Sequence, residues 1–318
     1  MTTSGTYAFG VNRDQIIRQA MLNIGKLDAE ESPLAQDTTD CSFVLNMLCK
    51  QWQGKTDFSA GLKVWTRKRG YLFLNNSTGR YSVGPGGTGW TNTPIFTTTT
   101  AAAAANATVL AVPAGLSIAT GDNVGIELDS GALFWTTVVS YATTVLTLTA
   151  GITSASLSGS QVYAYTTAAT QPIHIETAVL RDDTLNDVPV NIIRDVQTYD
   201  MLPQKANPQN MSDPTAIYYE FQLTNSYLYT DVGAAQDVTK YLVITYFEAV
   251  QDFNVPLDSP YYPQEWFLAL CWGLAKEIAP MYNAVWTPLM QENWTTSTAI
   301  AKKKDPEIRT DYYQPGAE

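Results

Sequence analysis

The sequence predicts an α+β protein in which helices from both chain ends form a helical bundle and strands fill the middle. Two observations support this prediction. Apolar residues recur at helical spacing over residues 12–54 and again over residues 263–282. Between about residues 65 and 250 they instead alternate in short runs bounded by Gly, Asn and Asp. Periods of 3.6 and 2 residues are typical of helices and strands respectively.

The chain divides into six predicted segments. These are an N-terminal segment of the helical core (1–70), a β-hairpin and connector (71–98), an inserted small β domain (99–168), a β-rich domain (169–250), a C-terminal segment of the helical core (251–301) and an extended C-terminal tail (302–318).

Two amphipathic helices are expected first. Asn12 is a suitable N-cap for one of them, and Gly25 can end it because glycine readily takes the left-handed conformation. Ser32-Pro33 is a suitable start for the other. Each helix has an apolar stripe that must be buried: Ile16, Ile17, Ala20, Met21 and Ile24 on the first, and Cys41, Leu45, Leu48 and Trp52 on the second.

From Trp65 the pattern changes to that of strands. The stretch "WTRKRGYLFLNNSTGRYSVG" predicts a hairpin, and "GPGGTGW" with "TTTTAAAAA" predicts a connector. In the inserted domain Val124, Ile126 and Leu128 alternate before a "DSG" turn. About five short strands are expected there, which form a small antiparallel β-barrel or sandwich. Further strands follow to residue 250, with one helical turn around "RDVQTYDML".

The C-terminal segment of the helical core should begin its first helix at Asp258 or Ser259, and this helix is unusual. The residues from Trp266 to Ala275 carry no charge, but this run is far shorter than the roughly 20 apolar residues of a membrane span. A helix that is apolar all round is buried on every side. We therefore expect the first two helices to cover part of it and a neighbouring subunit to cover the remainder. The residues proposed for this core or subunit-interface helix are Trp266, Phe267, Leu270, Trp272 and Leu274, and Ile278 continues the stripe.

The chain ends in a last helix, "AVWTPLMQENWTTSTAIAKKK", which should be interrupted at Pro288. The polar tail beyond it, "DPEIRTDYYQPGAE", should be extended.

Composition limits the classes of function. The net charge is −11, and no Lys or Arg occurs from Tyr81 to Leu180. Both observations argue against a broad surface that binds nucleic-acid phosphates. Charged residues make up 15% of the chain, against ~25% in typical soluble domains. A low fraction of charged residues indicates either that much of the surface is buried between subunits or that the protein is β-rich with many Thr and Ser. The N-terminus lacks the pattern of a signal peptide, so the three cysteines are expected to be buried thiols in a reducing compartment.

Residues for catalysis are sparse. The one histidine, His174, alternates with apolar residues and is expected to pack in a sheet, and "GPGGTG" lacks the Lys-Ser/Thr of a phosphate loop. The carboxylate pairs Asp182-Asp183 and Asp252 with Asp258 could serve a glycoside hydrolase, but solvated turns are commoner. We expect no enzyme, no cofactor and no metal site.

Two basic runs, Arg67-Lys68-Arg69 and Lys302-Lys303-Lys304, are too short for a nucleic-acid module. One interpretation places each run at the solvated end of a helix or strand. The alternative is that each run docks on an acidic neighbouring protein or contacts phosphates.

Taken in order, several stretches resemble the head-to-tail adaptors of tailed bacteriophages, the tail tubular protein A and tail accessory factor family of short-tailed phages. They are "DQIIRQAMLNIGKL", "VLNMLCKQWQ", "WTRKRGYLFL" with "GRYSVG", "DPTAIYYEFQ" with "SYLYTD", "YLVITYFEAVQDF" and "PQEWFLALCWGLAKEIAPMY". Together they cover about three-quarters of the chain. The inserted β domain is a departure from the smallest adaptors and is similar to insertions in larger ones.

The resemblance implies a structural virion protein at the head–tail interface, made in the host cytoplasm. Copies would form a homo-oligomeric ring, a dodecamer, that binds the portal protein, extends the DNA channel, retains packaged DNA until ejection and attaches the tail nozzle protein. Double-stranded DNA would pass without specific binding, and no membrane is involved. The tail should order on the portal, and the residues proposed for docking are Lys302, Lys303, Lys304, Ile308, Arg309, Tyr312 and Tyr313.

The alternative class is a receptor- or glycan-binding tail protein. Its support is the aromatic β surface, especially the module around Trp135, because aromatic faces stack on sugars. Helices at both ends have no evident purpose in such a protein.

Overall fold

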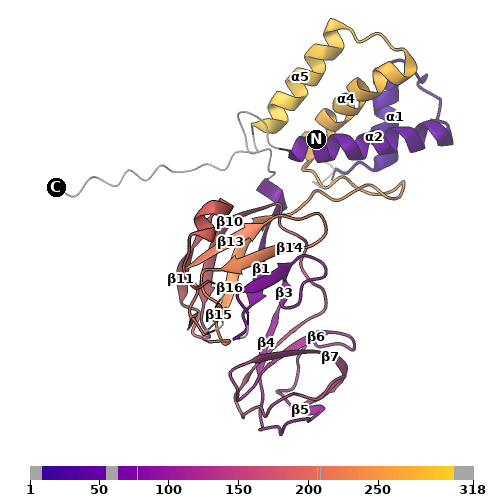
Figure 1. The fold of residues 1–318 in the computed structure, drawn as a ribbon. Helices are drawn as coiled ribbons and strands as arrows, with labels where there is room; N and C mark the ends of the chain where they lie inside the picture. The colour runs from indigo at the N-terminus through magenta and orange to yellow at the C-terminus, as the bar shows by residue number, and fades with distance from the viewer. Residues whose placement is uncertain are drawn as a thin grey trace, which may run out of the picture. The chain divides into compact units, whose positions relative to one another are not determined.

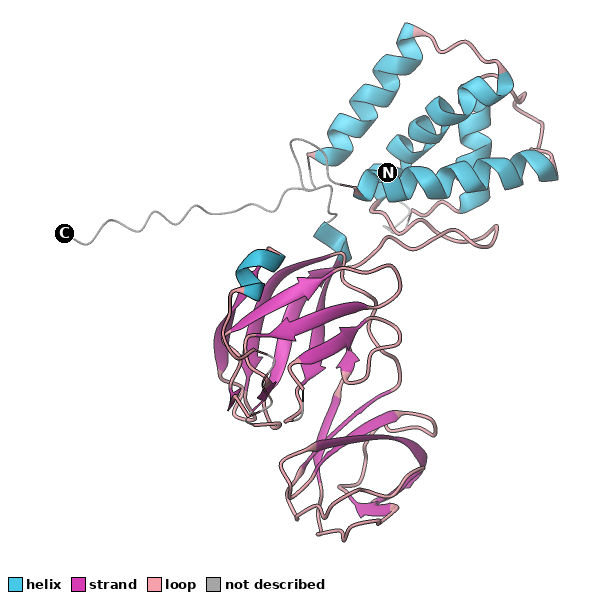
Figure 2. Ribbon diagram, in the orientation of Figure 1, coloured by secondary structure: helices cyan, strands magenta, loops and turns pink. Residues whose placement is uncertain are grey.

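The fold is that of a computed structural model, which describes residues 9–54, 64–76, 78–205, 207, 209–235 and 237–303 (Figure 1). These residues form five α-helices and three sheets, with more sheet than helix (Figure 2). The prediction of an α+β class is confirmed at this level. No helix in the described part of the chain is long and apolar enough to cross a membrane.

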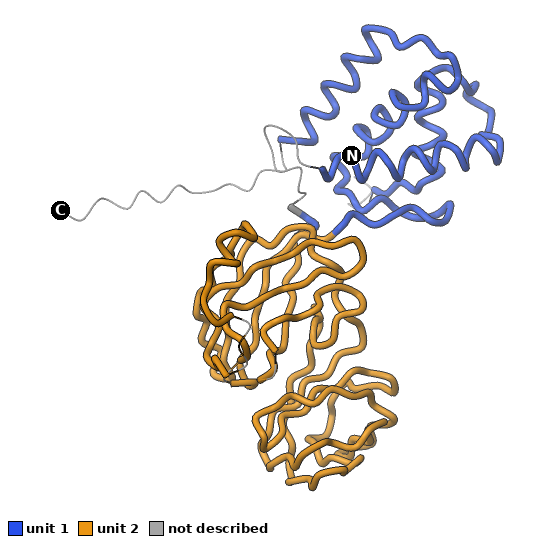
Figure 3. Tube along the Cα trace, in the orientation of Figure 1, with its two compact units in different colours: residues 1–66, 249–318 blue, residues 67–248 orange. Residues whose placement is uncertain are grey.

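Contacts divide the chain into two compact units, which Figure 3 shows in separate colours. The helical unit joins Met1–Thr66 to Ala249–Glu318, and the sheet unit is Arg67–Glu248. The sheet unit starts before the predicted boundary at residue 70, because β1 (Arg67–Phe73) pairs along its whole length with a strand of the large sheet.

The helical unit contains both chain ends. Its elements are α1 (Arg13–Asn23), α2 (Ala35–Gln53), η1 (Val64–Thr66), η2 (Gln264–Trp266), α4 (Phe267–Ile278), η3 (Ala279–Tyr282) and α5 (Pro288–Lys302). α1 begins as predicted, because the Asn12 side chain accepts a hydrogen bond from the Gln15 N–H and the Gln15 side chain accepts one from the Asn12 N–H, both at 2.9 Å. Gly25, at φ +71°, follows its C-terminal end.

Two predicted helix starts are wrong. α2 begins at Ala35 rather than at Ser32-Pro33, and no side chain caps it. Asp258 and Ser259 start no helix, because the Asp258 carboxylate accepts hydrogen bonds from two backbone N–H groups of the preceding loop and closes a turn. The helical path resumes only at η2.

The predicted interruption of the last helix at Pro288 is also wrong. Pro288 is instead the first residue of α5, and the Thr287 side chain caps the helix by accepting a hydrogen bond from the Met290 N–H. A proline fits the first helical turn because no intrahelical partner exists there for the N–H that it lacks.

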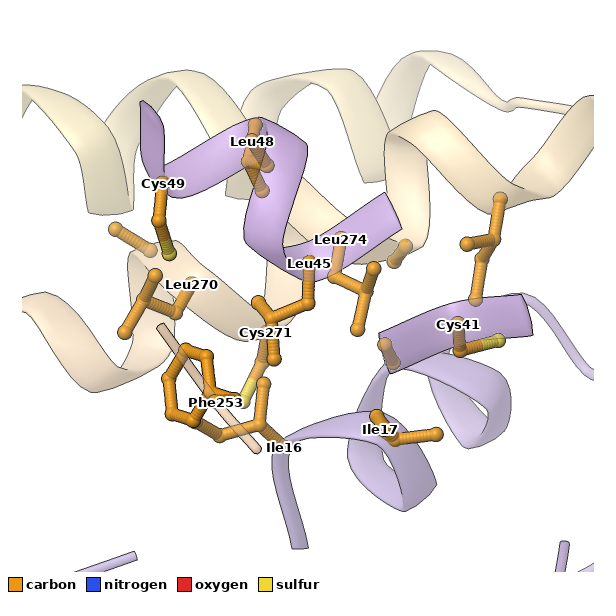
Figure 4. Close-up of a cluster of buried hydrophobic side chains, with 14 of the residues drawn as sticks. Ile16, Ile17, Cys41, Leu45, Leu48, Cys49, Phe253, Leu270, Cys271 and Leu274 are labelled. Atoms are coloured by element: carbon orange, nitrogen blue, oxygen red, sulfur yellow. The ribbon is translucent and has the colours of Figure 1, made fainter. Parts of the chain in front are cut away.

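The helical unit has one hydrophobic core, some of which Figure 4 shows. Leu270 and Leu274 of α4 are fully buried in it with residues of α1 and α2. All the predicted stripe residues of α1 and α2 belong to this core, although Trp52 is only partly buried at its edge. Helices from the two chain ends therefore share one core.

The large sheet of the sheet unit has eight strands in the order β2-β14-β13-β11-β10-β16-β1-β3. All neighbours are antiparallel except β11 and β13. Besides β1, its strands are β2 (Arg80–Val83), β3 (Trp90–Thr91), β10 (His174–Arg181), β11 (Asp187–Ile193), β13 (Ala216–Glu220), β14 (Ser226–Thr230) and β16 (Tyr241–Phe247). A two-stranded sheet, β12 (Met211–Ser212) with β15 (Ala234–Ala235), and the predicted helical turn, α3 (Val196–Asp200), belong to the same unit.

The inserted domain is a barrel-like antiparallel sheet in the order β4-β9-β6-β7-β8-β5. Its strands are β4 (Ile95–Thr98), β5 (Val109–Ala111), β6 (Asn123–Glu127), β7 (Leu133–Ala142), β8 (Val145–Leu148) and β9 (Gln161–Tyr165). The Thr100 N–H, just after edge strand β4, donates to the Ala111 carbonyl of edge strand β5 at 2.8 Å and so curls the sheet toward closure. β4 begins at Ile95 and so includes threonines that the sequence had assigned to a connector.

Aromatic side chains join the inserted domain to one face of the large sheet. Phe73 of β1 stacks on Tyr163 of β9, with ring centroids 4.2 Å apart and planes at 20°. Trp135 of β7 packs 5.8 Å from Phe73 and covers Gly125, where a Cβ atom would lie 2.8 Å from the indole. The Trp135 ring thus belongs to this packing and is not a free sugar-stacking surface.

Candidate functional site

α4 is the central helix of the helical unit and contacts α1, α2 and α5. Of the five residues proposed for a core or interface helix, Trp266, Leu270 and Leu274 are at most 2% exposed. Phe267 and Trp272 are half-buried. The chain itself therefore covers most of this apolar helix, and one side of the helix reaches the surface.

A glycine lets α2 approach α4 closely. A Cβ atom at Gly273 would lie 2.6 Å from the Trp52 indole, so only glycine fits beneath that ring. Trp52 in turn contacts Trp266 and Tyr262, with ring centroids 5.4 and 6.5 Å apart. Trp65 also contacts Tyr262 and Trp266. These four aromatic side chains fix the start of α4.

A groove of about 440 Å³ opens beside the exposed side of α4, against α1. Phe9 and Phe267 contact each other there with ring centroids 6.2 Å apart, and Leu268 is 58% exposed. Gln15, Arg18 and Gln19 of α1 add polar atoms to the lining, and Val11, Ile16 and Cys271 complete it. This α1–α4 groove is an apolar feature of the helical unit that another molecule could reach.

α2 carries a second exposed apolar surface, which does not line the groove. Phe43 is 66% exposed and Met47 is 50% exposed, and residues four apart are neighbours on a helix surface. We call this pair the α2 ridge. It was not predicted from the sequence, although two large apolar residues at this spacing and off the buried stripe were a usable signal.

The three cysteines are free and buried, as predicted. Burial raises the pKa of Cys49 and of Cys271 to about 12, and burial is also the main reason that the pKa of Cys41 is raised. Because the thiolate is the nucleophile, a raised pKa and burial disfavour reaction of these thiols near neutral pH.

Three of the four predicted carboxylates, all except Asp183, have structural partners within the described part of the chain. Asp252 is ion-paired with a lysine of α2 at 2.8 Å. Hydrogen bonds, chiefly from the Thr184 hydroxyl to Asp182 and from the Val255 N–H to Asp258, lower the pKa of both carboxyls. A general acid needs the opposite shift. Within the described residues, no group of three or more His, Cys, Asp or Glu side chains could hold a metal ion.

The first basic run lies on β1 and is paired within its own sheet. Arg67 is ion-paired with Glu176 at 2.8 Å and Lys68 with Glu248 at 3.5 Å, whereas Arg69 is exposed. Glu176 and Glu248 thus neutralise two of the three positive charges of this run, so these two charges need no external ligand.

The proposed docking tail falls mostly outside the described residues. Lys302 and Lys303 are exposed at the end of α5. The other proposed docking residues, Lys304, Ile308, Arg309, Tyr312 and Tyr313, lie beyond the described range.

The remaining motifs take ordinary structural roles. "GPGGTG" contains a turn in which the Gly87 N–H donates to the Gly84 carbonyl at 2.9 Å. His174 is half-buried at the start of β10, with its ring centroid 6.4 Å from that of Phe247.

Comparison with known proteins adds no family to these observations. No protein-family model matches the chain, and no curated protein matches it to a significant degree.

Proposed function

We propose that the chain is the subunit of a head-to-tail adaptor ring in a tailed bacteriophage, a structural virion protein and not an enzyme. In this proposal the helices of both chain ends act as a bundle that builds the ring, which docks below the portal and attaches the tail nozzle. The order of the adaptor-like sequence elements supports the proposal, and so does one feature of the helical unit.

That feature is a pair of unlike apolar surfaces on one unit, the α1–α4 groove and the α2 ridge. When two different surfaces of a protein meet, the contact is head-to-tail, and successive copies close into a ring if the rotation between them allows it. Leu268 in the groove and Phe43 on the ridge are each more than half exposed in the single chain. The occupant that we propose for the groove is therefore the α2 ridge of a second copy.

Charge supports a channel through which DNA slides. The net charge is −11, and the stretch from Tyr81 to Leu180 holds no Lys or Arg. Phosphate contacts by Lys and Arg supply most of the affinity of DNA-binding proteins. A wall without them lets DNA pass without holding it.

The test of ring formation is light scattering with particle imaging, on the chain alone and after mixing with portal protein from the same source. We expect a ring, alone or on the portal. The variants Leu268→Glu and Phe43→Lys should each prevent it, because each places a charge in an apolar contact, and the double variant should restore it by pairing the two charges. Leu223→Glu, at a position of the sheet unit that is 95% exposed, is the matched control.

A chain that stays monomeric with and without portal would refute the proposal. Rings that form equally well from Leu268→Glu would refute the groove as the contact. Truncation after Ala301 tests the tail separately: it should abolish portal binding and leave the circular dichroism spectrum of the helices unchanged.

A further inference from the structure

A second hollow, of about 270 Å³, lies in the sheet unit where the inserted domain meets the large sheet. Arg181 and Tyr241 line it, and strand pairing explains why they lie side by side. In one row across the large sheet, Asp187 of β11 pairs with Arg181 of β10, Arg181 pairs with Tyr241 of β16, and Tyr241 pairs with Phe73 of β1. Neighbouring strands thus place these side chains on the same face, toward the inserted domain. We call the hollow the junction cleft.

The walls of the junction cleft are aromatic. Phe96 of β4, which is 43% exposed, lies 5.1 Å from the Tyr241 ring with planes at 35°. Tyr71 of β1 lies 6.1 Å from the Phe96 and the Tyr241 ring centroids. The face of an aromatic ring carries partial negative charge, so it attracts the weakly positive C–H groups of an apolar molecular face. The cleft therefore offers a stacking surface to a flat ligand with C–H groups on one side.

The rim of the cleft is polar. Among the described residues, no hydrogen bond occupies the side chains of Asp183, in the turn after β10, or of Gln161, at the start of β9. Between them, a carboxylate and a carboxamide can accept and donate several hydrogen bonds. Two hydrogen bonds to Asp187, at 2.6 and 2.7 Å, hold the Arg181 guanidinium in place. These planar groups suit a ligand that has several hydroxyls around its edge.

The charge of the cleft disfavours an anionic ligand. Asp187 balances the charge of Arg181, and burial together with the nearby carboxylates Glu127, Asp237 and Asp183 raises the pKa of the Tyr163 hydroxyl. Because Asp187 neutralises Arg181, Asp183 leaves the cleft with a net negative charge, which repels ligands of the same sign. Nucleotides, nucleic acids and acidic sugars are therefore disfavoured.

We infer that the junction cleft binds one pyranose ring of an uncharged oligosaccharide. The apolar face of the ring stacks on the exposed part of Phe96, beside Tyr71, and its hydroxyls bond to Asp183 and Gln161. The cleft volume of about 270 Å³ suits a single sugar ring. Sites for drug-sized molecules, which are larger than one sugar ring, have volumes of ~300–1,000 Å³. A proline-rich peptide also stacks on aromatic side chains, but it needs a longer groove and leaves the two polar groups of the rim without ligand partners.

This inference is independent of the proposed ring, because the cleft belongs to the sheet unit and the groove and ridge to the helical unit. The test applies the full chain to an array of neutral oligosaccharides of glucose, galactose, mannose and N-acetylglucosamine, with their sialylated and sulfated counterparts. The strongest neutral hit is then titrated by calorimetry. We expect neutral oligosaccharides to bind and their acidic counterparts to bind more weakly.

Two variants locate the binding. Phe96→Ala and Asp183→Ala should each lower the affinity about tenfold or more, a loss of ~1.4 kcal/mol per factor of ten. Asp183 is exposed, so its replacement tests the site without disturbing the core. Phe221→Ala, at an aromatic position that is 60% exposed elsewhere in the same unit, should leave the affinity unchanged.

Three results of the sugar experiments would overturn the inference. They are an array on which no neutral oligosaccharide binds, a preference for the acidic counterparts, and a neutral hit whose affinity survives both Phe96→Ala and Asp183→Ala. Binding of a decaproline peptide without any sugar would assign the cleft to peptide recognition instead.

Discussion

The clearest energetic test compares two leucines of α4. Leu270 is fully buried and Leu268 is 58% exposed, and the two are only two positions apart on one helix. Leu→Ala removes three carbons, worth about 2.4 kcal/mol of transfer free energy when all are buried. Leu270→Ala also leaves a cavity, which brings the expected loss to about 3–4 kcal/mol. For Leu268→Ala, where less than half is buried and no cavity forms, about 1 kcal/mol or less is expected.

Urea unfolding followed by circular dichroism at 222 nm measures both variants, because helix is concentrated in the helical unit. With a slope of ~2 kcal/mol per M, Leu270→Ala should lower the midpoint by about 1.5–2 M and Leu268→Ala by about 0.5 M or less. The difference in helix propensity between Leu and Ala is the same in both variants and cancels. The protein must be dilute enough for light scattering to show a monomer. Equal losses, or a larger loss for Leu268→Ala, would refute the packing described for α4.

Three further predictions address the helical unit. Asn12→Ala should lower the free energy of unfolding by about 0.5–2 kcal/mol, measured by the same unfolding assay, because it removes the cap of α1; an unchanged midpoint would contradict the capping. Gly273→Ala should destabilise by about 1–3 kcal/mol despite the better helix propensity of alanine, because the new Cβ meets the Trp52 ring; a gain in stability would show that the two helices can separate at no cost. Cys49 and Cys271, whose pKa values burial raises to about 12, should resist a thiol reagent at pH 8 in the folded chain and react in 8 M urea, as mass spectrometry can count.

Local signals were enough to predict both ends of α1. The Asn12 cap and the Gly25 stop depend on contacts within a few residues, so the sequence contains all the information they need. Pro288 shows the limit of such reasoning. The same residue can interrupt a helix or begin one, and only the Thr287 cap, which precedes it directly, decides in favour of a start.

The junction cleft could not be predicted in this way. Phe96, Tyr241 and Arg181 are far apart in the sequence. The pairing of β10 with β16 places Arg181 beside Tyr241, and the packing of the inserted domain against the large sheet brings Phe96 to Tyr241. The alternation of aromatic residues on β1 and β16 does indicate that one sheet face is aromatic. The alternation does not indicate that the inserted domain leaves some of that face open. Which side chains lie side by side depends on the register between paired strands, and a single strand does not contain that information.

The placement of aromatic side chains shows which rings of the predicted aromatic surface the fold has already used. Trp135 is the largest side chain of its strand, but its ring covers a glycine and contacts Phe73, so it joins the inserted domain to the large sheet. Phe96, a smaller and less conspicuous residue, keeps 43% of its surface exposed beside the polar groups of the cleft rim. A ring can bind a ligand only with a face that the fold has not already used. For this reason exposure beside available hydrogen-bonding groups, and not aromatic size, identifies the residue that should contact a sugar.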